Sequence, residues 1–305
     1  RAVIVGRENV FDFSIGNPSV PAPDLVRETM LELLDMDPVT LHAYSPAAGL
    51  PEVKEAIAAY LSARYGMTAT PGHLYLTAGA AAALASSIAA VTQPGDEVVV
   101  VSPYFPEYRT WIEAAGCAIV EVPAAVPSFQ PDIEALRAAI GPKTSAVIIN
   151  TPNNPVGAVY TSESLEALAA MLREPYREIT YGIEVPWVPS LYARTIVCYS
   201  YSKALSLPGE RIGWVYVSDS ADDGDAVAVA VAGAGRALGY VCAPVLLQRV
   251  AARCVGEPSD VAAYAENRAI LTEGLSALGY EYVEPDGAFY LWVRALEEDA
   301  QAFSD

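Results

Sequence analysis

Residues 51–217 alternate between segments with a helical spacing of apolar residues and short runs rich in β-branched residues. The run at 97–101, which is mostly valine, is typical of a strand buried on both faces of a sheet. Strands that alternate with helices are joined by right-handed crossovers, which make the strands parallel and place helices on both faces. The sequence therefore predicts an α/β fold with a mainly parallel sheet between layers of helices.

The same periodicities locate the individual elements. Strands are expected at 97–101, 117–122, 145–150 and 195–199, and helices at 51–65, 80–91, 106–115, 131–140 and 162–173. After Val217, a turn rich in Asp and Gly leads to helices that run through Val250, then to a helix at 264–278 and a strand at 287–293. These last segments predict a second, smaller α+β layer.

Composition excludes several classes of function. The net charge of −19 over 305 residues leaves no basic stripe that could neutralise nucleic-acid phosphates. No run approaches the roughly 18 apolar residues of a membrane span, and no charged-then-apolar leader is present. The four cysteines have no metal-ligand spacing, so we expect buried thiols, no metal and a reducing, cytoplasmic location.

Lys203, one of three lysines in the chain, follows the predicted strand at 195–199 and lies among the hydroxyl residues Ser200 and Ser202. A lysine at a strand end is commonly a solvated surface residue. A desolvated lysine, in contrast, loses its proton readily, and its amine can form an imine with a carbonyl group. The residues around Lys203 decide between these two interpretations.

Two turns are candidate ligand sites, and open α/β sheets bind their ligands beyond the carboxyl ends of their strands. The small-residue turn at 77–81 opens a helix, whose first N–H groups and dipole can bind a phosphate. An ordinary helix start is the plain alternative. The turn at 150–157 contains Asn153-Asn154-Pro155 and holds an amide side chain where it can donate to an oxygen.

Two further features extend this pattern. Ser200 and Arg211 are both able to bind a phosphate, although an arginine in so acidic a chain could instead pair with a carboxylate. The aromatic residues at 104–108 offer a face on which a flat ring can stack, although aromatic residues there usually belong to the core. Together with the lysine and the asparagine, these groups describe a pyridoxal 5'-phosphate site.

The motif Ser200-x-Ser202-Lys203 with Arg211-x-Gly213, together with Asn153-Asn154-Pro155-x-Gly157, resembles the class I/II aminotransferases. These form the aspartate-aminotransferase-like branch of the fold-type I pyridoxal phosphate-dependent enzymes. The resemblance runs from the region of Asp12 to that of Trp292. It implies an aminotransferase that moves an amino group between an amino acid and a 2-oxo acid, and that forms a homodimer.

The resemblance also implies a division of the chain. Residues 1–43 would contribute to a small domain and to the substrate pocket, and residues 44–240 would form the large cofactor-binding domain. Residues 241–305 would supply a connecting helix and part of the small domain. The closing strands of that domain, with the arginine that binds the substrate α-carboxylate, are expected beyond Asp305, because no residue before it matches that arginine.

By resemblance, Lys203 would hold the cofactor as the internal aldimine and would then act as the base that moves the α-proton. The ring would stack on Phe105, and its phenolic oxygen would accept hydrogen bonds from Asn154 and Tyr176. The implied phosphate ligands are Ala80, Ala81, Ser200 and Arg211.

The substrate pocket and the partner subunit complete the implied site. Ile15 and Gly16, in the N-terminal turn, would line the substrate pocket together with Asn154. Tyr44 resembles the tyrosine that members of this family extend across the dimer interface to the phosphate of the neighbouring subunit.

One departure from the family pattern concerns the pyridine nitrogen. The family pairs this nitrogen with an aspartate at a strand end, three positions before the tyrosine that matches Tyr176, and here that position is Arg173. Either the strand and its aspartate are lost, or a segment is missing between Arg173 and Glu174. We expect the second, because without that strand its neighbours would have unpaired edges.

Two other functions stay open from the residues alone. A C–S lyase or another non-transaminating enzyme would share the cofactor and differ only in the fate of the substrate. Release of pyruvate and ammonia from a cysteine-type substrate, without a 2-oxo acid acceptor, would identify it. A catalytically silent effector-binding module is the other alternative, although no basic patch or helix-turn-helix precedes Asp12.

Overall fold

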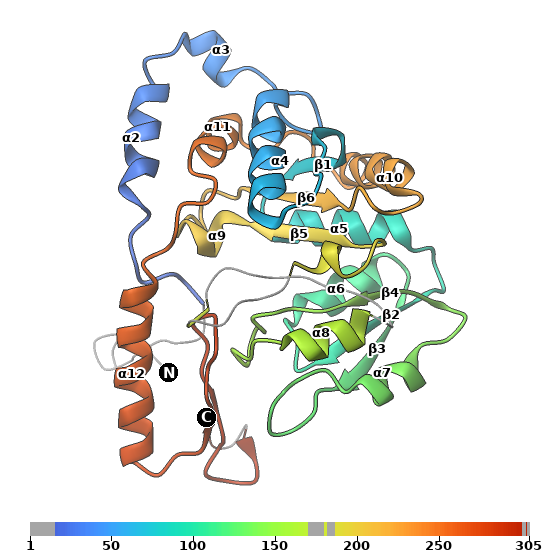
Figure 1. Ribbon diagram of the computed structural model, residues 1–305, viewed down its shortest axis with the longest axis vertical. Coiled ribbons are helices and arrows are strands. Elements are labelled where there is room, and N and C mark those ends of the chain that lie inside the picture. Colours follow the sequence, from blue (N-terminus) through green and yellow to red (C-terminus); the bar gives the residue numbers. More distant parts are fainter. Residues whose placement is uncertain (1–15, 170–179, 182–186, 301–302, 304–305) are drawn as a thin grey trace.

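A computed structural model describes residues 16–169, 180, 181, 187–300 and 303 of the protein (Figure 1). Six strands in these residues form two sheets. The first has the order β1 (Leu74–Thr77), β6 (Gly213–Val217), β5 (Ile196–Ser200), and the second has the order β3 (Ala118–Pro123), β2 (Glu97–Ser102), β4 (Thr144–Ile148). Strand β2 is parallel to both of its neighbours, whereas β6 is antiparallel to both of its own. The predicted α/β fold class is confirmed.

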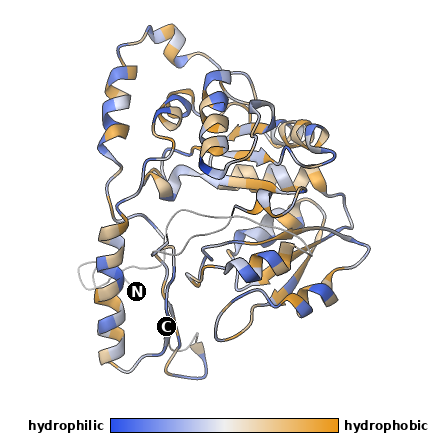
Figure 2. Ribbon diagram, in the orientation of Figure 1, coloured by the Kyte–Doolittle hydropathy of each residue, from blue (hydrophilic) through white to orange (hydrophobic). Residues whose placement is uncertain are grey.

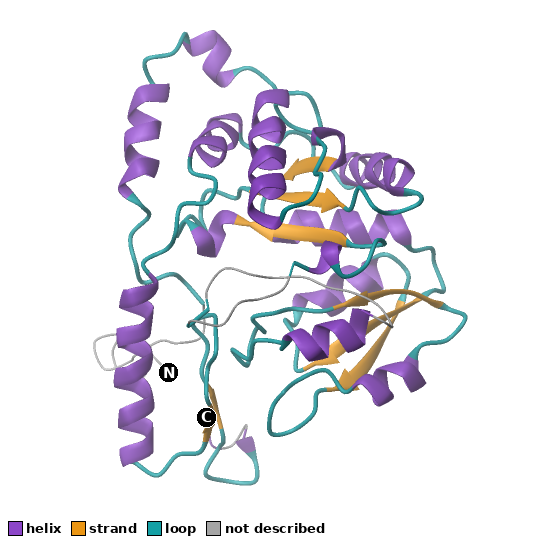
Figure 3. Ribbon diagram, in the orientation of Figure 1, coloured by secondary structure: helices purple, strands orange, loops and turns teal. Residues whose placement is uncertain are grey.

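The single sheet that the sequence predicts is divided in two among the described residues, as Figure 3 shows. Strand β4 pairs with β2, and β5 pairs with β6. Among the described residues, β4 and β5 are each at the edge of a sheet and do not pair with each other, so a strand between them would join the two sheets. The place in the chain where that strand is expected, at Arg173 and Glu174, lies outside the described residues.

Helices cover both faces of the first sheet. Helices α2 (Asp24–Leu33), α4 (Pro51–Tyr65) and α11 (Val245–Arg253) pack on one face, and α5 (Ala80–Val91) and α10 (Gly224–Ala237) pack on the other. Alternate residues of β6 serve the two faces, since Trp214 and Tyr216 belong to one core cluster and Val215 and Val217 to the other. The strands and α5 are largely hydrophobic in Figure 2.

Helix α5 lies between the two sheets, because it contacts β1, β5 and β6 on one side and β4 on the other (Figure 1). Its alanine and serine side chains are small, and most of those facing the sheets are buried. The outer side of the second sheet is covered by α7 (Ile133–Ala139) and α8 (Ser162–Ala169), while α6 (Glu107–Ala114) packs near α5. The short elements are α3 (Pro38–His42), η2 (Pro71–His73), η3 (Val188–Ser190) and α9 (Tyr201–Ala204).

The C-terminal part forms a smaller layer of α12 (Val261–Ala277) and the hairpin of β7 (Tyr282–Val283) and β8 (Trp292–Val293), side by side in Figure 1. The strand predicted at 287–293 is wrong over most of its length, since only Trp292 and Val293 belong to a strand there and Gly287 forms an isolated bridge with Thr180. Ala288 has a left-handed φ of 55°, which is incompatible with an extended strand. None of the described helices is both long and apolar enough to cross a membrane.

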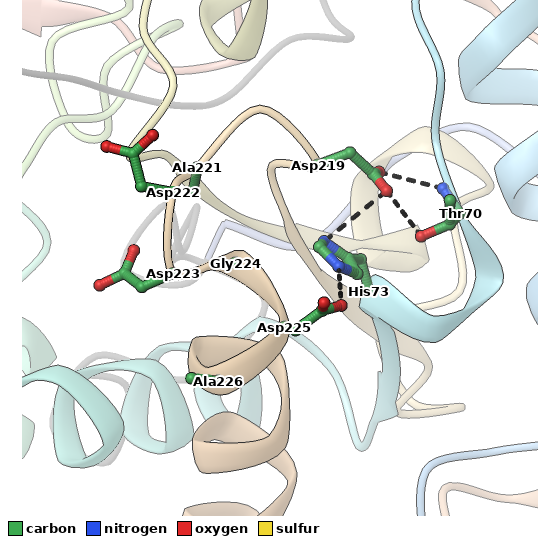
Figure 4. Close-up of a pocket in the computed structure, with 9 residues that line it drawn as sticks. All are labelled: Thr70, His73, Asp219, Ala221, Asp222, Asp223, Gly224, Asp225 and Ala226. Carbon is green, nitrogen blue, oxygen red and sulfur yellow. Dashed lines mark hydrogen bonds and ion pairs between the residues drawn. The ribbon is translucent and has the colours of Figure 1, made fainter.

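His73 joins three elements of the fold, and Figure 4 shows its contacts with Asp219 and Asp225. Its Nδ1 donates to the Val217 carbonyl at 3.0 Å, and its Nε2 donates to the Asp225 carboxylate, in the first turn of α10, at 2.9 Å. Both partners can only accept, so both ring nitrogens need a proton. Burial alone would lower the pKa of His73, but these two hydrogen bonds and the charges of Asp219 and Asp225 outweigh it, so the pKa is raised.

We expect His73 to stabilise the fold most at acidic pH. Its pKa is higher in the folded protein than in the unfolded chain, so its contribution is complete below about pH 6.5 and is lost as the pH rises through the folded value. His73→Gln should therefore lower the free energy of unfolding more at about pH 6 than at about pH 9, measured by urea denaturation.

Two aspartate variants serve as comparison. Asp225→Asn removes the carboxylate that accepts from Nε2, so it should remove most of this pH dependence. Asp223→Asn should retain it, since the Asp223 carboxylate points away from His73 in Figure 4. If His73→Gln lowers the free energy of unfolding equally at both pH values, the His73 ring is not protonated in the folded protein.

Candidate active site

Three segments meet at Gly213, the first residue of β6. Thr77, at the end of β1, and Ser200, at the end of β5, both pair with Gly213. A Cβ at Gly213 would lie 2.3 Å from the Tyr199 carbonyl oxygen and 3.1 Å from the Gly79 Cα, so glycine is required for this approach. The turn after β1, the turn after β5 and the residues before β6 therefore lie together.

Arg211 lies against the turn that opens α5. Gly79, the residue before α5, has a φ of 82°, and a Cβ on it would lie 2.5 Å from Arg211 Nη2. Arg211 donates to three oxygens, from Nη2 to the Ala78 carbonyl at 3.4 Å and from Nη1 to the Pro208 carbonyl at 2.9 Å and Ser202 Oγ at 3.4 Å. It forms no ion pair with a described carboxylate. Its charge is therefore available for an anion.

Hydroxyl and amide donors surround this guanidinium. Ser200 is the capping residue before α9, and its Oγ accepts from the Ser202 N–H at 3.1 Å and lies 2.8 Å from Ser202 Oγ. Gly79 gives α5 no side-chain cap, so the first N–H groups of that helix, at Ala80 and Ala81, remain for an acceptor. A guanidinium, hydroxyls and a helix N-terminus are the donors that bind a phosphate.

Lys203 projects from α9 next to this group of donors. Its Nζ donates to the Gly16 carbonyl and lies 4.8 Å from the centre of the Phe289 ring. Burial lowers the pKa of Lys203, and the positive charge of Arg211 lowers it further. The helix is held in place by Ser259 Oγ, which donates to the Lys203 and Ala204 carbonyls at 3.1 and 2.8 Å. The structure therefore presents a lysine that gives up its proton more readily than usual.

The turn after β4 directs Asn154 toward the same place. Asn150 and Asn153 are buried and bind the turn itself, since Asn150 Oδ1 accepts from the Asn154 N–H at 2.9 Å and Asn153 Oδ1 accepts from the Val156 N–H at 3.1 Å. The Asn154 side chain is used differently. Its Nδ2 donates to the Tyr290 hydroxyl at 3.1 Å.

The segment 287–290 packs against this turn. The Gly287 N–H donates to the Gly157 carbonyl at 3.0 Å, and a Cβ at Gly157 would lie 2.9 Å from the Tyr290 carbonyl oxygen. At Gly16, a Cβ would lie 2.7 Å from the Tyr290 hydroxyl and 3.2 Å from Phe289 Cε2. The two aromatic side chains thus lie against Gly16.

The structure brings most of the predicted site residues into two adjoining groups. Gly16, Asn154 and Lys203 form one group, joined through Phe289 and Tyr290. The other gathers the predicted phosphate ligands: Ala80, Ala81, Ser200 and Arg211.

The remaining predicted residues make other contacts, are exposed, or lie outside the description. The Phe105 ring packs on Tyr108 and Trp111, with ring centres 5.9 and 6.2 Å away. Tyr44 is 95% exposed. Ile15 and Tyr176 lie outside the described residues.

Sequence reasoning missed Phe289 and Tyr290. The apolar segment 287–293, with its aromatic residues, predicts a strand and so conceals their role. Gly287, two positions before the aromatic pair, is the available signal, since a glycine in a strand pattern often marks a close approach of another backbone. Phe289 and Tyr290 are far from Gly16 in the sequence, so only the tertiary structure brings them together.

Comparison with known proteins gives matches over almost the whole chain. The family described as aminotransferase class I and II matches residues 8–305. An aspartate/prephenate aminotransferase of Thermus thermophilus is 33% identical over 300 residues, which cover 90% of this chain and 74% of the relative. A valine–pyruvate aminotransferase of Mycobacterium tuberculosis is 31% identical over 317 residues, covering 97% and 79%. The crystal structure of an amino transferase from Eubacterium rectale has a TM-score of 0.95 and 50% identity, covering 99% of this chain and 81% of that one.

Gly79→Ala should destabilise the protein and weaken the anion site at the same time. The backbone of Gly79, with φ 82° and ψ 179°, is in a region open almost only to glycine, and a substitution there costs about 1–3 kcal/mol. Its Cβ would also displace Arg211. Thermal unfolding and phosphate binding by calorimetry measure the two effects.

Gly72→Ala is the control, because nothing lies within 4 Å of a Cβ there. Equal behaviour of the two variants would contradict the contact with Arg211.

Proposed function

This chain belongs to the class I and II aminotransferases, and on that premise we propose which of its residues carry out the reaction. The family uses pyridoxal 5'-phosphate, so the protein is a pyridoxal phosphate-dependent aminotransferase that moves an amino group between an amino acid and a 2-oxo acid. Membership of this family favours transamination over the C–S lyase and the silent binding module.

The donors at Gly213 fit the phosphate of the cofactor. Arg211 offers a forked cation without a carboxylate partner among the described residues, Ser200 offers a hydroxyl, and Ala80 and Ala81 offer N–H groups at the start of α5. Residues 79 and 213 are glycines, so no Cβ atom there keeps Arg211 and the turn before α5 from lying close together. When bound, the cofactor supplies an aldehyde that reacts with amines and a conjugated ring that takes up the electrons left by the α-proton.

Lys203 holds the cofactor through Nζ and moves the substrate proton. The observation that carries this proposal is the position of Nζ, which is desolvated and next to the phosphate donors. A lowered pKa keeps a larger fraction of the amine neutral, and only the neutral amine can attack an aldehyde or accept a proton. The same Nζ would accept the proton from the substrate α-carbon and then give it up again, so one side chain would both remove and return the proton.

The remaining roles follow the resemblance. Asn154 Nδ2 and Tyr176 donate to the phenolic oxygen of the cofactor, and Phe105 stacks on its ring. Ile15 and Gly16 line the substrate pocket with Asn154. Support for Asn154 comes from the buried turn that fixes its backbone, and support for Gly16 comes from its contact with Lys203.

The protein acts as a homodimer in which Tyr44 reaches the phosphate of the partner subunit. Its side chain is almost fully exposed, yet the backbone beside it is fixed. Gln248, which is completely buried, donates from Nε2 to Ser45 Oγ at 3.1 Å and accepts the Leu50 N–H at 2.8 Å. A large aromatic side chain held in solvent by a rigid loop is well suited to contact a second subunit.

The proposal also includes a division of the chain into domains and a cellular location. Residues 44–240 form the large domain, with residues 1–43 and 241–305 contributing the smaller one, in agreement with the change from sheet to hairpin after α10. The protein functions in the cytoplasm, since none of its four cysteines forms a disulfide.

Borohydride reduction of the protein mixed with pyridoxal phosphate should attach the cofactor to Lys203, detected by mass spectrometry of peptides. Lys203→Ala should abolish the adduct. Lys54→Ala should retain it, although burial lowers the pKa of Lys54 as well, because Lys54 lies on α4 away from the phosphate donors. A reducible adduct that survives Lys203→Ala would overturn the assignment. Pyruvate and ammonia formed from a cysteine-type substrate without an acceptor would contradict transamination.

Mixing two inactive variants tests the role of Tyr44. Lys203→Ala and Tyr44→Ala subunits, unfolded and refolded together, form mixed dimers. If Tyr44 acts across the interface, one of the two sites in each mixed dimer has both residues intact. Aminotransferase activity should then return to roughly a quarter of the unsubstituted level at equal amounts of each subunit. No recovery, with dimers confirmed by light scattering, would show that Tyr44 does not act in the partner site.

A further inference from the structure

The Tyr290 hydroxyl lies between Asn154 and Gly16. It accepts the hydrogen bond from Asn154 Nδ2 at 3.1 Å, and a Cβ at Gly16 would approach it to 2.7 Å. The edge of the ring is equally close, with Cε1 at 3.0 Å from the same Cβ position. Gly16 also contacts Lys203, whose Nζ donates to its carbonyl. Tyr290 therefore packs on the backbone that touches the catalytic lysine.

The Asn154 carboxamide depends on Tyr290 for its orientation. The backbone of Asn154 is fixed by Asn150, but the final torsion of an asparagine side chain is broad, and only a partner can restrict it. The Tyr290 hydroxyl is such a partner, and it occupies one of the two Nδ2 hydrogens. The second hydrogen remains for another acceptor.

The position of Tyr290 is set by its own segment. Gly287 pairs with Thr180, and the Tyr181 hydroxyl donates to the Ala288 carbonyl at 2.8 Å. The Phe289 ring stacks on Tyr264 of α12, with ring centres 5.5 Å apart and an interplanar angle of 17°. Burial raises the pKa of Tyr290, so its phenol stays protonated and neutral. The hydroxyl is thus held from the C-terminal layer against the turn after β4.

We propose that Tyr290 is a positioning residue, which orients the Asn154 carboxamide so that its second Nδ2 hydrogen meets the phenolic oxygen of the cofactor. Gly16 is the matching surface, because any larger residue would push the Tyr290 hydroxyl away from Asn154. The inference rests on the proposed function and adds a residue that acts on the cofactor through Asn154. It also makes the C-terminal layer part of the active site.

Tyr290→Phe removes the hydroxyl and keeps the ring, so the fold should be retained. The cofactor should bind about three- to tenfold more weakly, the change expected for one misaligned hydrogen bond. The pH midpoint at which the visible absorption of the bound cofactor changes should rise, because the ionised phenolic oxygen loses a well-aimed donor. A structural role alone would lower the melting temperature and leave this midpoint unchanged.

Gly16→Ala tests the same contact by a different route. This variant retains the Tyr290 hydroxyl group but moves it away from Asn154. It should therefore shift the cofactor affinity and the pH midpoint in the same direction as Tyr290→Phe. In the double variant, the fold-change in cofactor affinity should be smaller than the product of the two separate fold-changes. The reason is that the hydroxyl that Gly16→Ala displaces is already absent from Tyr290→Phe. Fully multiplicative effects would show that Gly16 and Tyr290 act independently, which would overturn the proposal.

Tyr282→Phe is the matched control, because it makes the same chemical change in the neighbouring strand β7. The Tyr282 hydroxyl lies 2.9 Å from Ser276 Oγ and 3.3 Å from the Thr272 carbonyl oxygen, both on α12. This variant should bind the cofactor with unchanged affinity and midpoint. An unchanged affinity and midpoint in Tyr290→Phe, with a normal Lys203 adduct, would overturn this inference alone. Absence of the adduct in the unsubstituted protein would overturn the proposed function and this inference with it.

Discussion

The pairing of Gly213 with both Thr77 and Ser200 is the constraint on which the rest of the site depends. Strand β6 is antiparallel to β1 and β5, so its first residue lies beside the last residues of both. A glycine there lets the Tyr199 carbonyl and Gly79 approach within distances that no side chain would permit. The helix start at Ala80, the lysine at 203 and the guanidinium of Arg211 gather around one point as a result.

The other side of the site is assembled from the two ends of the described chain. Gly16 contacts Lys203, and the segment 287–290 packs on the turn that carries Asn154. Glycine again permits the contacts, at 16 and at 157, where a Cβ would meet the side chain or the backbone of Tyr290. The first sheet and the C-terminal layer therefore share the surface around Lys203, although they belong to different parts of the fold.

Local structure could be predicted closely from the sequence. The helices expected at 51–65 and 80–91 have those limits in the structure, and the strand expected at 97–101 extends by one residue to Ser102. Apolar spacing determines these elements because the same side chains that set the period are buried on one face or on both. The strand expected at 287–293 fails for a tertiary reason, because the left-handed Ala288 and the contact with Gly157 bind this backbone to a turn rather than to a strand.

The sequence by itself determined the chemistry of this protein, since Lys203, Ser200, Arg211 and Asn154 each stand in a short motif whose residue types suit one task. It also determined the α/β class, through periodicities that neighbouring residues impose on one another. Only the tertiary structure decided which groups meet. The pairing of β1 with β6 and the docking of Tyr290 on Asn154 join residues separated by more than a hundred positions. Such contacts depend on shape and on the space that glycine leaves, which no local pattern encodes.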